Sequence, residues 1–141
     1  MKNKEDTIKQ INDRGPKFIE ILGGQLVDFD PDNTACTFEF DISTDFCHSI
    51  DIVQGGFVTA MLDAAMSHAT FICDQDVLNV SSLEIKTSYL APTRAGKLRV
   101  EGWVIKQSYK TAFMEGRLYN QDNELTATAS SVAKLLRAPK Q

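Results

Sequence analysis

The chain has 141 residues and a mass of 15.7 kDa, which suits one domain with its own hydrophobic core. Hydrophobic residues make up 43% and charged residues 24%, a balance that excludes an intrinsically disordered chain. The net charge of −4 comes without the basic stripe that nucleic-acid binding requires, so no nucleic-acid partner is expected. The three cysteines lack CxxC or Cys/His metal spacing, which predicts reduced thiols, a cytoplasmic protein and no bound metal.

No targeting or membrane segment is expected. The first six residues are mostly charged or polar, and no continuous apolar run with a small-residue cleavage site follows them. Residues 52–73 come nearest to the roughly 20 apolar residues of a membrane span. Gln54, Asp63, Ser67 and His68 interrupt that segment, so no membrane partner is expected.

Two short helices and two strands are predicted in the first third of the chain. Residues 4–14 are polar and compatible with a helix that Gly15-Pro16 ends, and residues 16–22 suggest a second helix with proline in its first turn. Strands are expected over residues 25–30 and 34–42, joined by a turn. The second strand alternates apolar and polar residues, so one of its faces should be buried.

The longest apolar segment, residues 55–73, follows a predicted loop over residues 43–54. Its alanines and methionines favour a helix, and it is apolar nearly all round, which is typical of a helix wrapped by other structure. The remainder has period two and predicts strands over residues 78–90, 97–107, 111–120 and 124–137. The buried character of residues 55–73 and the small-residue face of residues 124–137 both suit a subunit interface. That face of the last strand carries Leu125, Ala127, Ala129, Ser131, Ala133 and Leu135.

This order of elements predicts an α+β fold. A single antiparallel sheet curled around one central helix satisfies it, and that arrangement is the hotdog fold. We expect residues 1–23 to form an N-terminal helical segment and residues 24–137 to form the hotdog domain. No internal repeat or linker is visible.

Asp63 is the one charged residue of the central apolar segment. Burying an unpaired carboxylate is costly, and no Lys or Arg lies on this helix to pair with it. One interpretation is a general base or nucleophile. The other is a structural carboxylate that accepts a hydrogen bond from a strand or faces a polar subunit interface.

Gly55-Gly56 and the two histidines are weaker signals. Glycine at a helix start exposes N–H groups that can stabilise a developing oxyanion, although the pair also suits a tight loop-to-helix turn. His48 lies in the loop before Gly55 and could reach a site there or remain on the surface. His68 lies about 140° round the helix from Asp63, so a triad within the helix is excluded and a partly buried structural histidine is expected. No GxSxG motif supports a serine hydrolase.

Two sequence blocks resemble the PaaI-type (phenylacetate-degradation) hotdog thioesterases. The family's first motif is Asn or Gln, a short loop, His-Gly-Gly and then Asp or Glu eight residues after the first Gly. The run in this chain that resembles it is His48-Ser-Ile-Asp-Ile-Val-Gln-Gly-Gly-Phe-Val-Thr-Ala-Met-Leu-Asp63. The second block, Ser82-Leu-Glu-Ile-Lys-Thr-Ser-Tyr89-Leu-Ala-Pro92, resembles the family's Thr-x-Asp-Leu-x-x-x-Tyr-Leu-x-Pro strand. The resemblance covers about residues 24–137 and implies a hotdog acyl-CoA thioesterase.

The resemblance also implies residue roles. Gly55 would polarise the thioester carbonyl through its N–H, and Asp63 of the facing subunit would activate water or attack directly. Ser82 would assist the carboxylate or the water, and His48 would orient the carbonyl or the water. Coenzyme A enters as part of the substrate, with no separate cofactor. The residues that the analogy assigns to its nucleotide and pantetheine are Tyr89, Arg94, Lys106, Lys110 and Thr111.

The chain departs from the family pattern at two positions. Gln54 stands where the family usually has His, and His48 stands where it usually has Asn or Gln. The leading hypothesis is hydrolysis of a small-to-medium acyl- or aryl-CoA by a homodimer or a dimer-of-dimers tetramer. The alternative is a non-catalytic acyl-CoA sensor, but such regulators usually carry a DNA-binding module and lack the acid. A hotdog hydratase would need an Asp…His dyad that is not matched here.

Overall fold

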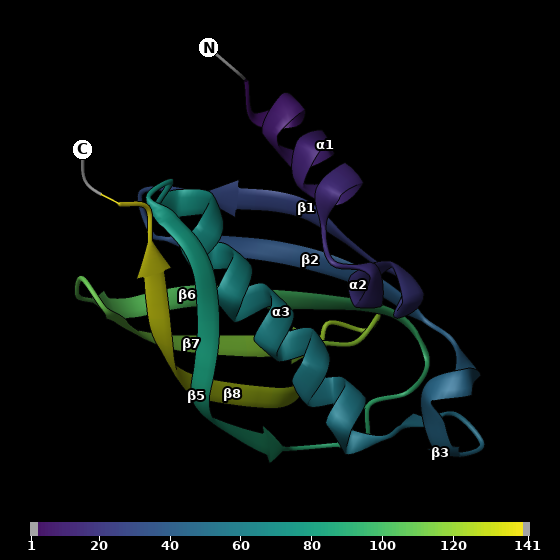
Figure 1. Ribbon diagram of the computed structural model, residues 1–141. Coiled ribbons are helices and arrows are strands. Elements are labelled where there is room, and N and C mark those ends of the chain that lie inside the picture. The colour runs from purple at the N-terminus through teal and green to yellow at the C-terminus, as the bar shows by residue number, and fades with distance from the viewer. Residues whose placement is uncertain (1–2, 140–141) are drawn as a thin grey trace.

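The computed structural model describes residues 3–139 and begins with two helices that the sequence predicted (Figure 1). The first is α1 (Lys4–Arg14), whose N-cap Asn3 accepts a hydrogen bond from the N–H of Asp6. The second is α2 (Lys17–Ile21), with Pro16 as its N-cap rather than in its first turn. Residues 1 and 2 of the predicted N-terminal segment lie outside the described residues.

Within residues 3–139, six antiparallel strands form the main sheet, in the order β1-β2-β6-β7-β8-β5. Their bounds are β1 (Gly24–Asp30), β2 (Ala35–Ile42), β5 (Val77–Tyr89), β6 (Gly96–Gln107), β7 (Thr111–Tyr119) and β8 (Leu125–Arg137). The two edges of the sheet are therefore β1 and β5. The predicted strands are confirmed to within a few residues at their ends.

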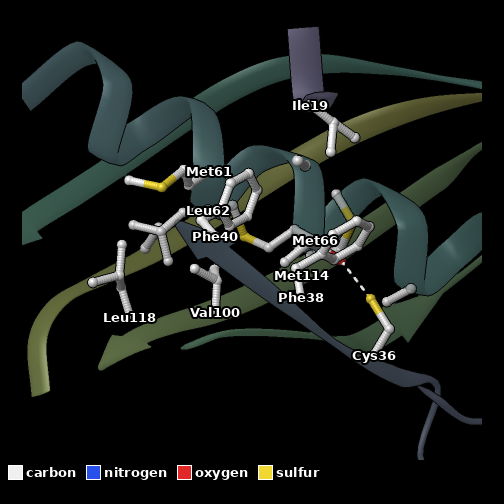
Figure 2. Close-up of a cluster of buried hydrophobic side chains, with 14 of the residues drawn as sticks. Ile19, Cys36, Phe38, Phe40, Met61, Leu62, Met66, Val100, Met114 and Leu118 are labelled. Carbon is white, nitrogen blue, oxygen red and sulfur yellow. Dashed lines mark hydrogen bonds between the residues drawn. The ribbon is translucent and has the colours of Figure 1, made fainter. Parts of the chain in front are cut away.

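The sheet curls around the central helix α3 (Gly55–Cys73), which confirms the predicted hotdog architecture (Figure 1). The core fills the space between α3 and the inner face of the sheet, and Figure 2 shows Phe38, Phe40, Met66 and Met114 within it. By length and composition alone, α3 could cross a membrane, as could the core helix of many globular domains, and 44% of its most apolar window is buried inside the structure.

The alternating burial of β8 corrects one prediction and confirms another. The alternation itself is confirmed, because the side chains of Ala127, Ala129, Ser131, Ala133 and Leu135 are all buried. They are buried within this chain, in the same core as α3, so the prediction that this small-residue face forms a subunit interface was wrong. Small residues there allow α3 to approach the sheet.

The predicted loop over residues 43–54 also has more structure than expected. It holds a short 3-10 helix, η1 (Thr44–Phe46), and a small hairpin of β3 (Cys47–Ser49) and β4 (Ile52–Val53). Strands of two or three residues are too short for a periodic pattern to reveal. The hairpin brings Phe46 to the start of α3, where its backbone carbonyl accepts a hydrogen bond from the N–H of Gln54 at 2.9 Å.

Gly102 on β6 marks the point where the backbone of α3 lies directly on the sheet. A Cβ atom there would lie 2.5 Å from the backbone N of Met66 and would also clash with the carbonyl carbon of Ala65. Gly102 pairs in register with Gly116 of β7, where a Cβ atom would meet its nearest neighbour at 3.1 Å. Neither glycine stands out in the sequence.

We expect Gly102→Ala to lower the free energy of unfolding by about 3 kcal/mol or more, because a backbone contact cannot relax as a side chain can. Gly116→Ala is the matched control, with an expected loss of about 1 kcal/mol. Urea unfolding of both variants measures the difference. Equal losses would show that α3 is free to move away from the sheet at Gly102.

Candidate active site

Asp63 lies midway along α3 and is partly buried beside the edge strand β5. The hydroxyl of Ser82 on β5 donates a hydrogen bond to Oδ1 of Asp63 at 2.8 Å. Within residues 3–139 no Lys, Arg or His side chain forms an ion pair with this carboxylate, and nothing donates to its Oδ2. The structure therefore joins two residues predicted for the site, and one carboxylate oxygen remains available to a water molecule or a substrate.

The start of α3 presents one free backbone donor. The side chain of Gln54 caps the helix by accepting the N–H of Gly56 at 2.7 Å. In the part of the chain that the structure describes, no group accepts the N–H of Gly55. Gln54 therefore shapes the helix start, and the N–H of Gly55 points from the positive end of the helix.

A pocket of about 660 Å³ opens at this helix start. Gly55 and Gly56 line it together with the exposed His48 and with Tyr89, the last residue of β5. Pro92 and Thr93, which follow β5, also line the pocket. The structure thus brings three predicted site residues, His48, Gly55 and Tyr89, to one cavity.

The hydroxyl of Tyr89 is engaged with the helix rather than directed to solvent. It donates to the carbonyl oxygen of Gly55 at 2.8 Å and lies 3.0 Å from Oγ1 of Thr59, which in turn lies 2.8 Å from Oγ1 of Thr87. A Cβ atom on Gly55 would come within 3.0 Å of the Tyr89 hydroxyl oxygen. Glycine at this position therefore allows the ring to pack against the helix start.

Thr59 and Thr87 were not predicted as site residues, although their positions in the sequence carry a signal. Thr59 lies four residues after Gly55, on the same side of the helix, and Thr87 alternates with Tyr89 along one face of β5. Together with the Asp63–Ser82 contact, they form a polar seam between α3 and β5. Within this chain, β5 is attached to α3 by hydroxyl groups at each of these points.

The residues predicted to hold coenzyme A lie at two ends of the sheet. Arg94 lies just before β6, beside the pocket at the helix start, and its guanidinium pairs with Asp51 at 2.7 Å. Lys106 lies at the far end of β6, Lys110 lies in the turn that follows, and Thr111 begins β7. Ten residues of extended strand separate the two groups by about 30 Å, so a single chain does not bring them together.

The length of α3 also separates Gly55 from Asp63. Eight helical residues between them correspond to about 12 Å along the axis of α3. One thioester carbonyl cannot contact the N–H of Gly55 and the carboxylate of Asp63 of the same chain at hydrogen-bonding distance. Two half-sites lie on each chain: the pocket at the helix start, and the Asp63–Ser82 pair.

His68 is the partly buried structural histidine that the sequence predicted. Its Nδ1 lies 2.9 Å from the carbonyl oxygen of Ala64, and its ring packs edge-on against Phe38 and Phe71. Burial lowers the pKa of His68, although the Ala64 hydrogen bond and the charge of Asp63 act in the opposite direction. The histidine is therefore neutral at pH 7 and lies on a different side of α3 from Asp63.

Comparisons with known proteins agree with this architecture. The sequence model of the Thioesterase superfamily matches residues 51–127, which is more than half of the chain and includes Gly55, Asp63 and Ser82. No curated protein sequence matches the chain.

Solved structures show the same fold at low sequence identity. A phenylacetic acid degradation-related protein from Ralstonia eutropha JMP134 superposes with a TM-score of 0.82 at 24% identity, covering 91% of this chain and 98% of that one. The PaaI protein of the E. coli phenylacetic acid degradation operon has a TM-score of 0.80 at 16% identity, covering 95% and 96%. A thioesterase from Haemophilus influenzae has a TM-score of 0.81 at 15% identity, covering 100% and 95%. From the family match and the hotdog fold that it shares with these proteins, the chain belongs to the Thioesterase superfamily.

Proposed function

We propose that this protein is a cytoplasmic acyl-CoA thioesterase that hydrolyses a small-to-medium acyl- or aryl-CoA at Asp63. The observation that carries the proposal is the carboxylate of Asp63, which stands alone on an apolar helix, is held by the Ser82 hydroxyl and has one oxygen free. A carboxylate fixed in this way suits a general base or a nucleophile. The family to which the chain belongs supports thioester chemistry.

In the general-base form of the mechanism, Asp63 takes a proton from water as the water oxygen attacks the thioester carbon. The carbonyl oxygen gains negative charge and is stabilised by the free N–H of Gly55 at the positive end of α3. The intermediate collapses when the carbon–sulfur bond breaks, and the thiolate of coenzyme A takes up the proton. His48, at the rim of the same pocket, would orient the carbonyl or the water.

The two halves of this site come together if α3 of one chain lies antiparallel beside α3 of its copy. Residue 59 lies midway between Gly55 and Asp63 along α3. If the two-fold axis crosses α3 at residue 59, Gly55 of one chain faces Asp63 of the second chain. Thr59 contacts Thr87, so the same axis crosses β5 near Thr87. The antiparallel arrangement also carries Lys106, Lys110 and Thr111 of one chain toward the end of the sheet where the other chain has Tyr89 and Arg94.

The two edges of the sheet differ in a way that supports pairing through β5. Asn12 of α1 covers the β1 edge, accepting the N–H of Leu26 at 2.7 Å and donating to its carbonyl oxygen at 3.0 Å. The β5 edge carries the exposed side chain of Leu83, and the exposed Leu90 directly follows the strand. Within residues 3–139, β5 pairs with β8 and with no other strand. A long, apolar, unpaired edge strand is a surface that proteins normally cover. We infer a homodimer or a dimer-of-dimers tetramer.

We expect Leu83→Lys to dissociate the dimer. Leu83 is 65% exposed. A two-fold axis near Thr87 places Leu83 of one chain within one residue position of Leu90 of the second chain. A lysine at residue 83 would therefore bury a charge in an apolar contact. The dimer dissociation constant should rise at least about tenfold, and specific activity should increase with enzyme concentration. Sedimentation and dilution assays measure both effects.

The control for this variant is Ile21→Lys, because Ile21 is 58% exposed but lies on α2, away from β5. It should leave the assembly and the activity unchanged. A Leu83→Lys protein that sediments like the wild type would show that β5 is not the subunit contact.

Tyr89→Phe separates two roles of this tyrosine. The variant keeps the ring against Gly55 but removes the hydroxyl that donates to the Gly55 carbonyl. If the hydroxyl positions the helix start, kcat should fall about threefold to tenfold with KM unchanged. A rise in KM at constant kcat would instead assign the hydroxyl to coenzyme A. Tyr119→Phe, on the outer face of the sheet, is the control.

A substrate panel tests the function as a whole. Acyl-CoAs of increasing chain length and aryl-CoAs should be assayed for released thiol, with Asp63→Asn as the blank. At least one member should be hydrolysed with a kcat/KM in the range of ordinary enzymes, above about 10⁴ M⁻¹s⁻¹. Binding of the panel without any hydrolysis would replace the thioesterase by the acyl-CoA sensor.

A further inference from the structure

A second cavity, of about 670 Å³, lies between α1 and the C-terminal half of α3. Ile11 and Arg14 contribute its α1 wall, and His68, Phe71 and Ile72 contribute its α3 wall. Asn12 fixes α1 to the backbone of Leu26 by two hydrogen bonds, so this wall has a defined position. The volume is that of a site for a small organic molecule.

His68 gives the cavity an unused hydrogen-bond acceptor. A carbonyl oxygen can only accept, so Nδ1 of His68 carries the proton that is donated to the carbonyl of Ala64. Burial lowers the pKa of His68 and keeps the ring neutral, so Nε2 has a free lone pair. Among residues 3–139 no donor reaches this atom, and the ring belongs to the lining of the cavity.

Arg14 gives the cavity its charge. Its side chain forms no ion pair with any residue in the described range, and no Asp or Glu is among the described residues that line the cavity. Arg14 is exposed, while the half-buried Phe71 and Ile72 give the cavity an apolar lining. A cation, an apolar lining and a hydrogen-bond acceptor define three chemical requirements for a ligand.

We propose that this cavity binds an apolar carboxylic acid that carries a hydroxyl group on its chain. The carboxylate would pair with Arg14, the chain would lie against Ile11, Phe71 and Ile72, and the hydroxyl would donate to Nε2 of His68. Asp63 takes no part in this site, since it lies about 140° round α3 from His68. The site is therefore independent of thioester hydrolysis.

Three probes of equal chain length test the three requirements: ω-hydroxyoctanoate, octanoate and octane-1,8-diol. Calorimetric titration at pH 8 should show that ω-hydroxyoctanoate binds about tenfold more tightly than octanoate, which lacks the hydroxyl, and than octane-1,8-diol, which lacks the carboxylate. Arg14→Gln should weaken the two carboxylates about tenfold and leave the diol unchanged. His68→Phe, which retains an aromatic ring between Phe38 and Phe71, should equalise ω-hydroxyoctanoate and octanoate.

Several outcomes overturn the proposal. These are no binding of any probe at millimolar concentration, binding that Arg14→Gln does not alter, or equal affinity of the wild type for the three probes. If His68→Phe does not fold, the ring signals of wild-type His68 replace it, and they should shift with ω-hydroxyoctanoate more than with octanoate. Titrating Asp63→Asn in parallel separates this site from the catalytic one, because its affinities should equal those of the wild type.

Discussion

Asp63→Asn is expected to lower kcat at least about a hundredfold while the fold and the assembly persist. Asparagine keeps the shape of the side chain and can still accept the Ser82 hydrogen bond at its amide oxygen, which in the wild type is 2.8 Å long. It cannot take a proton from water or attack a thioester carbon. The loss therefore isolates the chemical role of the carboxylate from its structural role. Steady-state kinetics on the best substrate of the panel measures it.

Two further variants make the result specific to the carboxylate. Ser67→Ala changes a partly buried polar residue one turn further along α3 and should leave kcat within about twofold. Ser82→Ala removes the only side-chain donor to Asp63 within the described residues and should cost about tenfold. If Asp63→Asn retains near-normal turnover, Asp63 is a structural carboxylate that accepts a strand hydroxyl, which the sequence left open as an alternative.

The fold could be predicted because its signals are local and periodic. The central helix is long, apolar and opened by Gly55, and the later strands alternate for nine or more residues each. The same alternation predicted that one face of β8 is buried. It did not predict which part of the protein packs against that face. A small-residue face packs equally well against a helix of its own chain or against a neighbouring subunit. Only the three-dimensional arrangement shows that α3 occupies it.

The site was less predictable, since its contacts join distant parts of the chain. Asp63 stood out as a charge in an apolar helix, but its pairing with Ser82 rested on the family resemblance and not on any spacing in the sequence. Gly102 offered no signal, because a glycine in a strand does not reveal which backbone crosses it. The hydroxyl contacts of Tyr89 with Gly55 and Thr59 likewise depend on how β5 lies along α3.

Mixing two inactive variants should restore activity if each site draws Gly55 from one chain and Asp63 from the other. In Gly55→Val the side chain collides with the ring of Tyr89, displacing the N–H that faces the carbonyl. A heterodimer of Gly55→Val and Asp63→Asn then has one site with both defects and one site with neither. Random reassociation makes half of the dimers mixed, so an equimolar mixture should recover about a quarter of the wild-type activity.

The measurement requires exchange of subunits, which dilution followed by reconcentration permits, and each variant treated alone is the control. A mixture of Asp63→Asn with Ser82→Ala gives a second reference. Ser82 and Asp63 of one chain contact each other, so both substitutions damage the same half-site, and the mixture should stay below the activity of Ser82→Ala alone. If the Gly55→Val mixture gains nothing, the shared site is wrong. Gly55 and Asp63 of one chain lie about 12 Å apart along α3, so the N–H and the carboxylate would then not act on the same thioester carbonyl.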